Sequence, residues 1–427
     1  MAGNAVVKLG LLGFGTVGSS FAEVLAASGR DDIRITHLFN RGVARKREHE
    51  RAKFVPADAV WTERVEDVLE AAEVDVVVEL MGGLDPVEGW LRTALRAGKH
   101  VVTANKQLIA YRGTELLELA GAAKVQLLYG AAVAGGVPVI PGMVQGLSGD
   151  VIQRISGIVN GTCNFILSSM EAGADYAEVL ADAQRAGYAE ANPSADVDGF
   201  DARAKLCILA RLALRAEFNP DDVPAQTISQ VSAVDFAYAK ELGCTIRQVS
   251  RAEIDGETVR ARVGPMLVPQ TSPIAWSHGT QNMVVTSGRF GGDVVFSGHG
   301  AGGHPTAVAV MSDVIAVAHG SSAVQLPAKK FAVSGDCFAP HYLRFIVSDK
   351  PGIVASIAGA LARQHINIDS ILQHRGHAAD HLPFVVTTEP CMTSTLEKAM
   401  EQMAIMDFML EPPMALQMVV VDDKDTD

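Results

Sequence analysis

Two lysines and a neighbouring aspartate are the residues of this sequence best suited to move protons. Lys106 follows Thr103-Ala104-Asn105 at the end of an expected strand, and Lys205 stands four residues after Asp201 on an expected helix. A spacing of four places Asp201 and Lys205 on one helical face, and the spacing alone favours an ordinary surface ion pair between them. An ammonium group can protonate, or stabilise, an oxygen on which negative charge develops. Lys106 is therefore placed to act, whereas a catalytic role for Asp201 and Lys205 needs evidence beyond their spacing.

A glycine-rich turn near the N-terminus predicts binding of a dinucleotide. The apolar run 6–12 ends at this turn, and an amphipathic stretch through Ser28 follows it. In such a strand–turn–helix context, the glycines allow a tight turn and close approach of a pyrophosphate, which the helix N-terminus attracts. A tight turn without a ligand is the alternative. The expected cofactor contacts in this turn are Gly13, Phe14, Gly15, Thr16, Val17 and Gly18.

The choice between NAD and NADP depends on the end of the second expected strand. An acidic residue there usually binds the ribose hydroxyls of NAD, but this sequence has Asn40-Arg41, followed by Arg45, Lys46 and Arg47. The basic run 45–47 is equally typical of a solvated helix face. Arg41 favours NADP, although NAD stays possible. We expect Asn40, Arg41, Thr103, Lys106 and Gly302 to complete the cofactor site.

The hydrophobic pattern predicts three domains. Alternating apolar runs and amphipathic stretches, including helices at 43–54, 87–97 and 113–122, predict a doubly wound parallel sheet of the Rossmann type over 1–130. Residues 131–333 read as an α+β substrate-binding and dimerisation domain, from which the helix 304–320 returns to the first domain. Residues 341–421 have the βαββαβ order of a ferredoxin-like module. The polar tail 422–427 is expected to be disordered.

Composition excludes several classes of function. The net charge is −13 and no run of Lys and Arg is interleaved with aromatic residues, so we expect no nucleic-acid partner. The uncharged stretch 125–149 is long enough to cross a bilayer, but its glycines and prolines favour buried turns, and we expect no membrane partner. Five widely spaced cysteines and an N-terminus without a signal-peptide pattern indicate a cytoplasmic protein.

Several motifs together resemble homoserine dehydrogenases. The segment from Ala183 to Lys205 meets every fixed position of that family's signature pattern. The segments 103–106, 133–138, 160–162 and 298–306 match further family motifs in the family's order. Within the last module, 349–352 and 367–368 resemble an ACT domain, which senses small molecules. The resemblance covers essentially the full chain.

The resemblance implies NAD(P)-dependent interconversion of L-homoserine and L-aspartate 4-semialdehyde. Lys205 and Lys106 would act as acid/base or substrate anchor, and which one donates the proton stays open. Asp201 would position Lys205 or the substrate hydroxyl. The residues implied to bind substrate are Glu190, Asp196, Tyr188, Thr162 and Gly161; Tyr188 as a core residue and Asp196 as a turn cap are the alternatives.

The resemblance also implies a cation, an effector and an oligomer. A sodium or potassium ion would bind main-chain oxygens of Val133, Gly135 and Val137. Gly130 replaces a glutamate that is common in the family, so we expect weak cation binding or none. The ACT domain implies inhibition by L-threonine, whereas a degenerate domain would serve dimerisation only. A homodimer or homotetramer is expected.

Two other functions are compatible with parts of the sequence. A semialdehyde dehydrogenase would need a nucleophilic cysteine, for which Cys163 is the candidate. A non-catalytic sensor would bind a dinucleotide and an amino acid without turnover.

Overall fold

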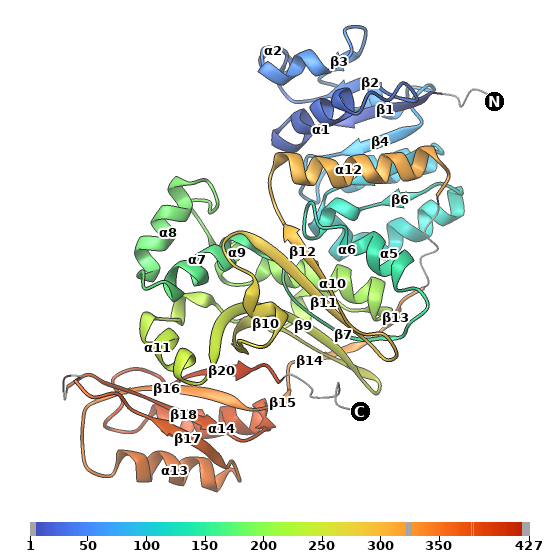
Figure 1. The fold of residues 1–427 in the computed structure, drawn as a ribbon. Helices are drawn as coiled ribbons and strands as arrows, with labels where there is room; N and C mark the ends of the chain where they lie inside the picture. The colour runs from blue at the N-terminus through green and yellow to red at the C-terminus, as the bar shows by residue number, and fades with distance from the viewer. Residues whose placement is uncertain (1–5, 322–326, 377, 379, 421–427) are drawn as a thin grey trace. The chain divides into compact units, whose positions relative to one another are not determined.

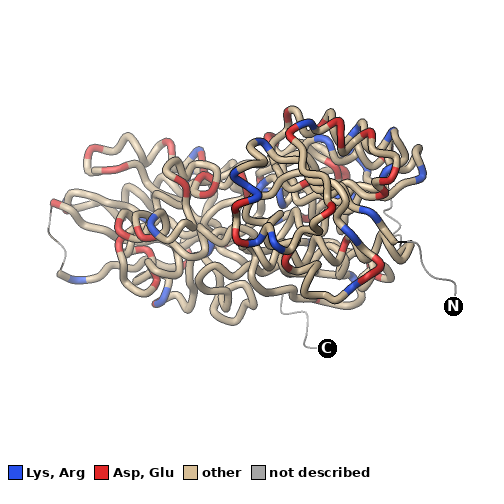
Figure 2. Tube along the Cα trace, turned by 90° about the horizontal axis from the view of Figure 1, so that it is seen from above, with Lys and Arg blue, Asp and Glu red and all other residues tan. Residues whose placement is uncertain are grey.

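The computed structural model describes residues 6–321, 327–376, 378 and 380–420, so the predicted tail 422–427 lies outside the described residues. Contacts group the chain into two compact units. Unit 1 comprises residues 1–153, 204–220 and 282–330, and unit 2 comprises 154–203, 221–281 and 331–427. In the described part of the chain, Lys and Arg are interspersed with Asp and Glu (Figure 2). No helix among the described residues is long and apolar enough to cross a membrane.

Unit 1 contains the predicted parallel sheet. Its six strands are ordered β3-β2-β1-β4-β5-β6, and each described pairing is parallel. The order turns back at β1, which is the doubly wound arrangement that the sequence predicts. The strands are β1 (Val7–Leu12), β2 (Ile33–Phe39), β3 (Val60–Thr62), β4 (Val76–Glu79), β5 (His100–Thr103) and β6 (Leu127–Leu128).

Four helices of unit 1 position the residues of interest. Helix α1 lies beside α12, and their apolar faces share one core with β1 and β2 (Figure 1). Helix α4 packs against α5, whose first residue is Lys106. The bounds are α1 (Thr16–Ala27), α4 (Val87–Arg96), α5 (Lys106–Ala123) and α12 (Gly303–Ala318); shorter elements are α2 (Val43–Arg47), η1 (Glu50–Phe54), α3 (Glu66–Leu69), η2 (Gly130–Ala132), α6 (Val139–Pro141), η3 (Gly142–Gly146), β8 (Ala216–Glu217), β11 (Gln281–Gly288), β12 (Gly292–His299) and β13 (Lys329–Lys330).

Two helix predictions in this unit were wrong at their boundaries. The expected helix 43–54 is two short helices, α2 and η1, because the chain becomes extended at His49, whose side chain caps η1. The expected helix 113–122 begins seven residues earlier, because Asn105 accepts a hydrogen bond from the Leu108 amide (3.1 Å) and so caps α5 at Lys106.

Unit 2 contains a mixed sheet with the order β7-β9-β10-β20-β16-β18-β17. Strand β20 pairs in parallel with β10 (Met266↔Gln417) and antiparallel with β16 (His341↔Gln417). The sheet of the C-terminal module therefore continues the sheet that precedes it in the chain. The strands are β7 (Ile152–Ile158), β9 (Cys244–Asp255), β10 (Thr258–Pro269), β14 (Ala332–Ser334), β15 (Phe338–Ala339), β16 (His341–Val347), β17 (Ile368–Leu372), β18 (Leu382–Thr388), β19 (Cys391–Met392) and β20 (Met414–Met418).

The helices of unit 2 flank this sheet. Helices α13 and α14 complete the predicted βαββαβ module (Figure 1). Their bounds and those of the other helices are α7 (Gly161–Glu171), α8 (Tyr176–Arg185), α9 (Ser194–Val197), η4 (Pro220–Asp222), η5 (Ile228–Gln230), α11 (Ala233–Glu241), η6 (Pro273–Trp276), α13 (Ile353–Arg363) and α14 (Thr393–Ala404); α10 (Phe200–Ala213) runs from unit 2 into unit 1.

A buried polar cluster fastens the C-terminal module to α11. Asp235, which is fully buried, accepts hydrogen bonds from the Ser232 amide (2.8 Å) and the Tyr342 hydroxyl (2.8 Å) and pairs with Arg344. Tyr342 and Arg344 both belong to β16. A buried charge needs such partners, so this cluster holds the first strand of the module against the helix.

Candidate active site

The glycine-rich turn has the geometry that dinucleotide binding requires. Gly13 follows β1 with φ +103°, and a Cβ on Gly18 would lie 2.1 Å from the Gly13 carbonyl oxygen. A Cβ on Gly15 would meet no atom within 4 Å, so open space lies in front of the turn. The first residues of α1 then offer their amides to this space, where a phosphate would be stabilised.

Phe14 and Asn40, two of the predicted cofactor residues, fix the backbone of this turn by their packing and hydrogen bonds. The Phe14 amide donates to Asn40 Oδ1 (3.0 Å), and Asn40 Nδ2 donates to the Arg41 carbonyl (2.9 Å). The Phe14 ring is fully buried and lies edge-on to Trp61, with ring centroids 5.1 Å apart. Arg41 is exposed at the end of β2. Of these three side chains, only that of Arg41 is presented to solvent.

A carboxylate that the sequence reasoning missed organises the neighbouring loops. Glu79, at the end of β4, is fully buried and accepts hydrogen bonds from the Met81 amide (2.7 Å), the Gly82 amide (2.9 Å) and the Thr103 hydroxyl (2.5 Å). Thr103 was predicted to contact the cofactor, but its side chain points to Glu79. A glutamate ending an apolar strand before a Gly-Gly pair is the signal that could have identified it.

A cavity of about 400 Å³ in unit 1 joins the glycine-rich turn to both lysines. Lys106, Lys205 and Thr16 line it, together with residues from three loops. The loops follow β4, β5 and β6, at the carboxyl ends of the parallel strands where ligands of doubly wound folds bind. The lining residues include Thr16, Val17, Lys106, Gly135, Lys205 and Gly302.

The second glycine cluster closes one wall of this cavity. Gly302 has φ +119°, and a Cβ on Gly303 would lie 2.6 Å from Ser20 Oγ. A Cβ on Gly135 would lie 2.5 Å from the Gly300 carbonyl oxygen. These close approaches need glycine, because a Cβ at 303 would press on α1 and a Cβ at 135 would press on the Gly300 backbone.

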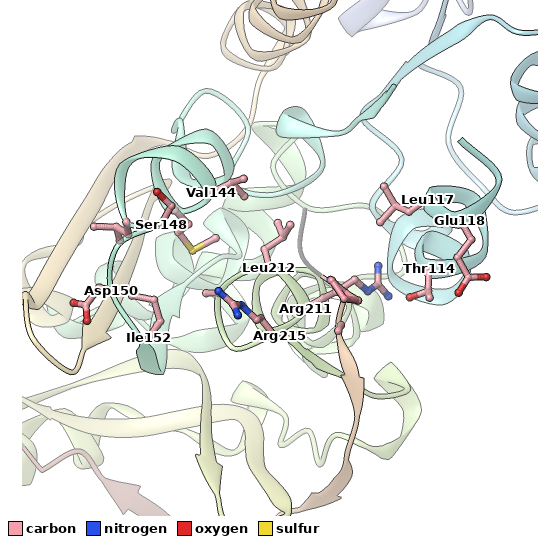
Figure 3. A pocket seen from close by; sticks show the side chains of 15 residues that line it. Thr114, Leu117, Glu118, Val144, Ser148, Asp150, Ile152, Arg211, Leu212 and Arg215 are labelled. Carbon is pink, nitrogen blue, oxygen red and sulfur yellow. The ribbon is translucent and has the colours of Figure 1, made fainter. Parts of the chain in front are cut away.

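Arg211 ties the helix of Lys205 to the helix of Lys106. Its guanidinium donates from Nη1 to the Ile109 carbonyl (2.8 Å) and from Nη2 to the Ala110 carbonyl (3.3 Å). A separate cavity of about 320 Å³ lies beside it, and Figure 3 shows Arg211 reaching toward the helix that carries Thr114 and Glu118. Arg211 therefore fixes the distance between α10 and the first turns of α5.

In unit 2, one asparagine holds two of the predicted carboxylates. Asn160 caps α7 by accepting from the Cys163 amide (2.9 Å), and its Nδ2 donates to Asp196 Oδ1 (2.7 Å) and Asp201 Oδ2 (3.0 Å). Gly199, with φ +82°, makes the turn between the two aspartates. The three polar groups thus form one cluster, and Lys205 follows Asp201 one turn along α10.

The remaining predicted substrate residues surround the start of α7 and the loop after α8. The Thr162 hydroxyl donates to the Tyr188 carbonyl (2.7 Å), and the Tyr188 ring packs edge-on against Phe165, 5.2 Å between centroids. Tyr188 is 48% exposed, so it does not fill the core. Glu190 is exposed, and Gly161 is the first residue of α7.

Cys163 is poorly placed for a nucleophile. It is fully buried in α7, and its thiol donates to the Asp196 carbonyl (3.2 Å). A reactive cysteine needs access to substrate and a stabilised thiolate. The contact instead helps to hold the turn that carries Asp196.

The predicted cation segment lies beside a half-buried carboxylate from another helix. Val133 and Val137 are buried, and Ala134 and Gly135 have φ near +50°. The Gly130 amide donates to Asp313 Oδ2 (2.7 Å), and a Cβ on Gly130 would lie 2.9 Å from Asp313 Oδ1. Burial raises the pKa of Asp313 to about 7. Glycine at 130 thus leaves room for the Asp313 carboxyl group.

Three family models match successive parts of the chain. Residues 13–130 match the NAD-binding domain of homoserine dehydrogenase, 138–315 match homoserine dehydrogenase, and 341–405 match an ACT domain. A homoserine dehydrogenase of Mycobacterium tuberculosis is 40% identical over 385 residues, 86% of each chain. The chain belongs to the homoserine dehydrogenase family.

Solved structures of homoserine dehydrogenases share this fold. The enzyme of Thiobacillus denitrificans has a TM-score of 0.87 and 32% identity, covering 97% of this chain and 98% of its own. A hyperthermophilic archaeal homoserine dehydrogenase in complex with NADPH has a TM-score of 0.64 and 25% identity, covering 75% and 99%. The family is one of NAD(P)-dependent oxidoreductases, so the semialdehyde dehydrogenase and sensor alternatives are not the function of this chain.

Proposed function

We propose that Lys205 and Lys106 carry out proton transfer during interconversion of L-homoserine and L-aspartate 4-semialdehyde. The observation that carries this proposal is the cavity in unit 1 that both lysines line beside the glycine-rich turn. The nicotinamide ring, when bound, accepts a hydride from the substrate carbon or returns it. The lysines supply the proton that accompanies the hydride.

Charge balance during hydride transfer requires a group that donates and accepts a proton, and a lysine can do both. In the reducing direction, hydride addition to the aldehyde carbon leaves negative charge on its oxygen, which a lysine ammonium group neutralises by donating a proton. In the oxidising direction, the neutral amine takes the hydroxyl proton back. Asp201, one turn before Lys205 on α10, positions that lysine or the hydroxyl.

The polar residues around Asn160 would hold the amino-acid part of the substrate. Asp196 and Glu190 would bind the ammonium group and the hydroxyl. Tyr188, Thr162 and Gly161 would line the pocket. The hydrogen bonds from Asn160 to Asp196 and Asp201 support this role, because desolvated carboxylates that bind a charged substrate need fixed orientations.

NADP is the preferred cofactor in this proposal, with NAD as the second choice. Arg41 is exposed at the end of β2, and a 2′-phosphate would suit its charge. The NADPH complex of the archaeal relative supports the same choice. Backbone groups of Gly13, Gly15 and Gly18 would hold the pyrophosphate.

We further propose that the ACT domain binds L-threonine as an inhibitor. A cavity of about 170 Å³ lies beside the turn 349–352 and is lined by Lys350, Gln373 and Phe384 among others. Pairing of whole subunits would give a homodimer or homotetramer, which light scattering can measure. The five spaced cysteines suit a cytoplasmic location.

Cation dependence should be weak. Main-chain oxygens of Val133, Gly135 and Val137 suit Na⁺ or K⁺. Gly130, however, supplies no carboxylate ligand, and the Asp313 carboxyl group accepts a hydrogen bond from the Gly130 amide. Replacing KCl and NaCl by an organic-cation salt should leave most of the activity.

One assay tests the proposal. Homoserine-dependent reduction of NADP⁺ and of NAD⁺ is measured for the wild type, Lys205→Met, Lys106→Met and Lys124→Met, the last a control at the C-terminal cap of α5. We expect loss of about 10²- to 10⁴-fold in kcat for the proton-donating lysine and wild-type activity for Lys124→Met. Full activity in both Lys205→Met and Lys106→Met would refute the assignment. Added L-threonine tests inhibition in the same assay.

A further inference from the structure

A second cavity of unit 2 lies away from the turn 349–352. It has a volume of about 500 Å³ and is bounded by β10, the segment 224–226, helix α14 and strand β20. Its walls therefore come both from the ACT module and from the sheet that the module extends. Its lining residues include Arg262, His341, Leu396, Glu397, Met400 and Gln417.

One wall of this cavity carries a cation whose partner is neutral. Arg262 Nη1 donates to Gln417 Oε1 (3.0 Å), and Gln417 is only 7% exposed. Within the described ranges, Arg262 forms no ion pair with a carboxylate. Burial lowers the pKa of Arg262. A guanidinium group has five N–H donors, so this site can accept an anion and would be stabilised by one.

The buried histidine in the same wall adds no competing charge. His341 is 2% exposed, and burial together with the nearby Arg262 lowers its pKa to about 4. It is therefore neutral at physiological pH. The anion-binding group of the cavity is Arg262.

The opposite charge stands at the mouth of the cavity. Glu397 and Glu401 are exposed and lie one turn apart on α14, and Glu397 is near enough to raise the pKa of Arg262. Apolar side chains of Leu396 and Met400 lie on the same helix. A cation inside, carboxylates at the rim and an apolar wall between them match a zwitterion with an aliphatic body.

The floor of the cavity packs against the turn that carries the substrate carboxylates. Val263, next to Arg262, donates its amide to the Pro224 carbonyl (2.9 Å), and its own carbonyl accepts from the Gln226 amide (2.9 Å). A Cβ on Gly199 would lie 3.1 Å from Val263 Cγ1 and 3.4 Å from Ala225 Cβ. Gly199 separates Asp196 from Asp201, so a shift of the floor reaches both aspartates.

We propose that this cavity is an effector site for a small aliphatic amino acid, whose carboxylate pairs with Arg262 and whose ammonium group faces Glu397. Occupancy changes the affinity for homoserine through Val263 and Gly199. The coupling to homoserine affinity rests on the proposed substrate role of Asp196 and Asp201. Binding of the amino acid in the cavity does not rest on that role, because binding can be measured without turnover.

Calorimetry with three probes of equal chain length tests the site in the full-length protein. L-Norleucine carries both charges, hexanoate only the carboxylate, and pentylamine only the ammonium group on the same aliphatic chain. We expect saturable binding that is tightest for norleucine, weaker for hexanoate and absent for pentylamine. No saturable binding of norleucine at millimolar concentrations would overturn the proposal.

Three variants locate the binding. Arg262→Met should weaken both carboxylate probes at least tenfold, whereas Glu397→Gln, an exposed change that leaves folding intact, should weaken norleucine but not hexanoate. Gln373→Ala, in the cavity beside the turn 349–352, is the control and should bind norleucine as the wild type does. Norleucine binding that is lost in Gln373→Ala and kept in Glu397→Gln would place the ligand in the other cavity and refute the site.

The link to the substrate site has its own readout. Saturating norleucine should change the KM for homoserine in the wild type and in Gln373→Ala, with no change in Arg262→Met. Thermodynamic reciprocity requires homoserine to change the norleucine Kd by the same factor as norleucine changes the homoserine Kd. Norleucine binding with an unchanged homoserine Kd would refute the coupling, whereas an inactive wild-type enzyme would refute the proposed function instead.

Discussion

Replacing Arg211 by methionine tests how the two lysines are held. Arg211 is only 7% exposed, and its two hydrogen bonds to α5 start from the helix that carries Lys205. Methionine fills much of the same space but donates nothing. The change therefore removes the link between α10 and α5 without adding charge.

The expected loss of stability in Arg211→Met follows from the contacts of Arg211. A hydrogen bond from a charged donor contributes about 1.5–3 kcal/mol, and the bond at 3.3 Å is the weaker of the two. Arg211 Nε is buried without a hydrogen-bond partner among the described residues, and removing it returns about 1–3 kcal/mol. We expect a net loss of roughly 2 kcal/mol in the free energy of unfolding. A displacement of about 1 Å between reacting groups costs up to ~10²-fold, so kcat should fall about 10- to 100-fold.

The assay combines steady-state kinetics with NADPH titration. Dinucleotide affinity should stay at the wild-type value, because the turn 13–18 lies on other elements. Arg215→Met is the matched control: Arg215 lines the same cavity as Arg211 but is exposed, and its loss should change kcat less than about twofold (Figure 3). Wild-type kcat in a destabilised Arg211→Met variant would refute the reasoning, and so would equal losses in the two variants.

Three further changes give distinct readouts. Gly18→Ala puts a Cβ 2.1 Å from the Gly13 carbonyl oxygen and should abolish NADPH binding in a fluorescence titration; normal binding would contradict the close approach. Arg41→Ala should raise the KM for NADP⁺ about tenfold or more and leave that for NAD⁺ unchanged, since only NADP carries the 2′-phosphate; equal effects on both would remove Arg41 from the phosphate site. Asp313→Asn tests pH dependence: because the folded-state pKa of about 7 lies above the unfolded value of about 3.9, the wild type loses stability as pH rises between these values. Of the full linkage of about 4 kcal/mol, about 2.7 kcal/mol falls between pH 5 and pH 8, and solvent screening of this half-buried group roughly halves that loss. The loss should be absent from urea unfolding of Asp313→Asn over the same pH range. Parallel pH profiles of the two proteins would refute the assignment.

Local signals predicted the elements that bind the cofactor. The apolar run before Gly13 and the glycines themselves specify a strand, a turn and a helix, and the structure confirms them with β1 and α1. The expected helix began seven residues too late, at 113, although Asn105 is a good helix cap for α5. The pairing of β20 with β10 joins residues about 150 positions apart, and no local pattern carries that information.

Side-chain direction limited the prediction of the site. Asn40 and Thr103 stand where cofactor contacts are expected, yet the structure turns them toward Phe14 and Glu79. Both are short polar residues at strand ends, which can face either a ligand or the backbone of the next loop. The cluster of Asn160, Asp196 and Asp201 depends on a fold that brings α7 to the turn at Gly199, so the chain order alone could not show it.

The cluster around Asp235 limits how the proposed inhibition by L-threonine can be tested by deleting the ACT domain. Cutting the chain before β14 would remove the partners Tyr342 and Arg344 from Asp235. It would also expose the apolar residues of α11 and β9 that share a core with the C-terminal module. The truncated protein would be destabilised, so a change in its activity would not report on regulation. The proposed inhibition is therefore better tested by single substitutions in the two cavities of unit 2 than by deletion of the module.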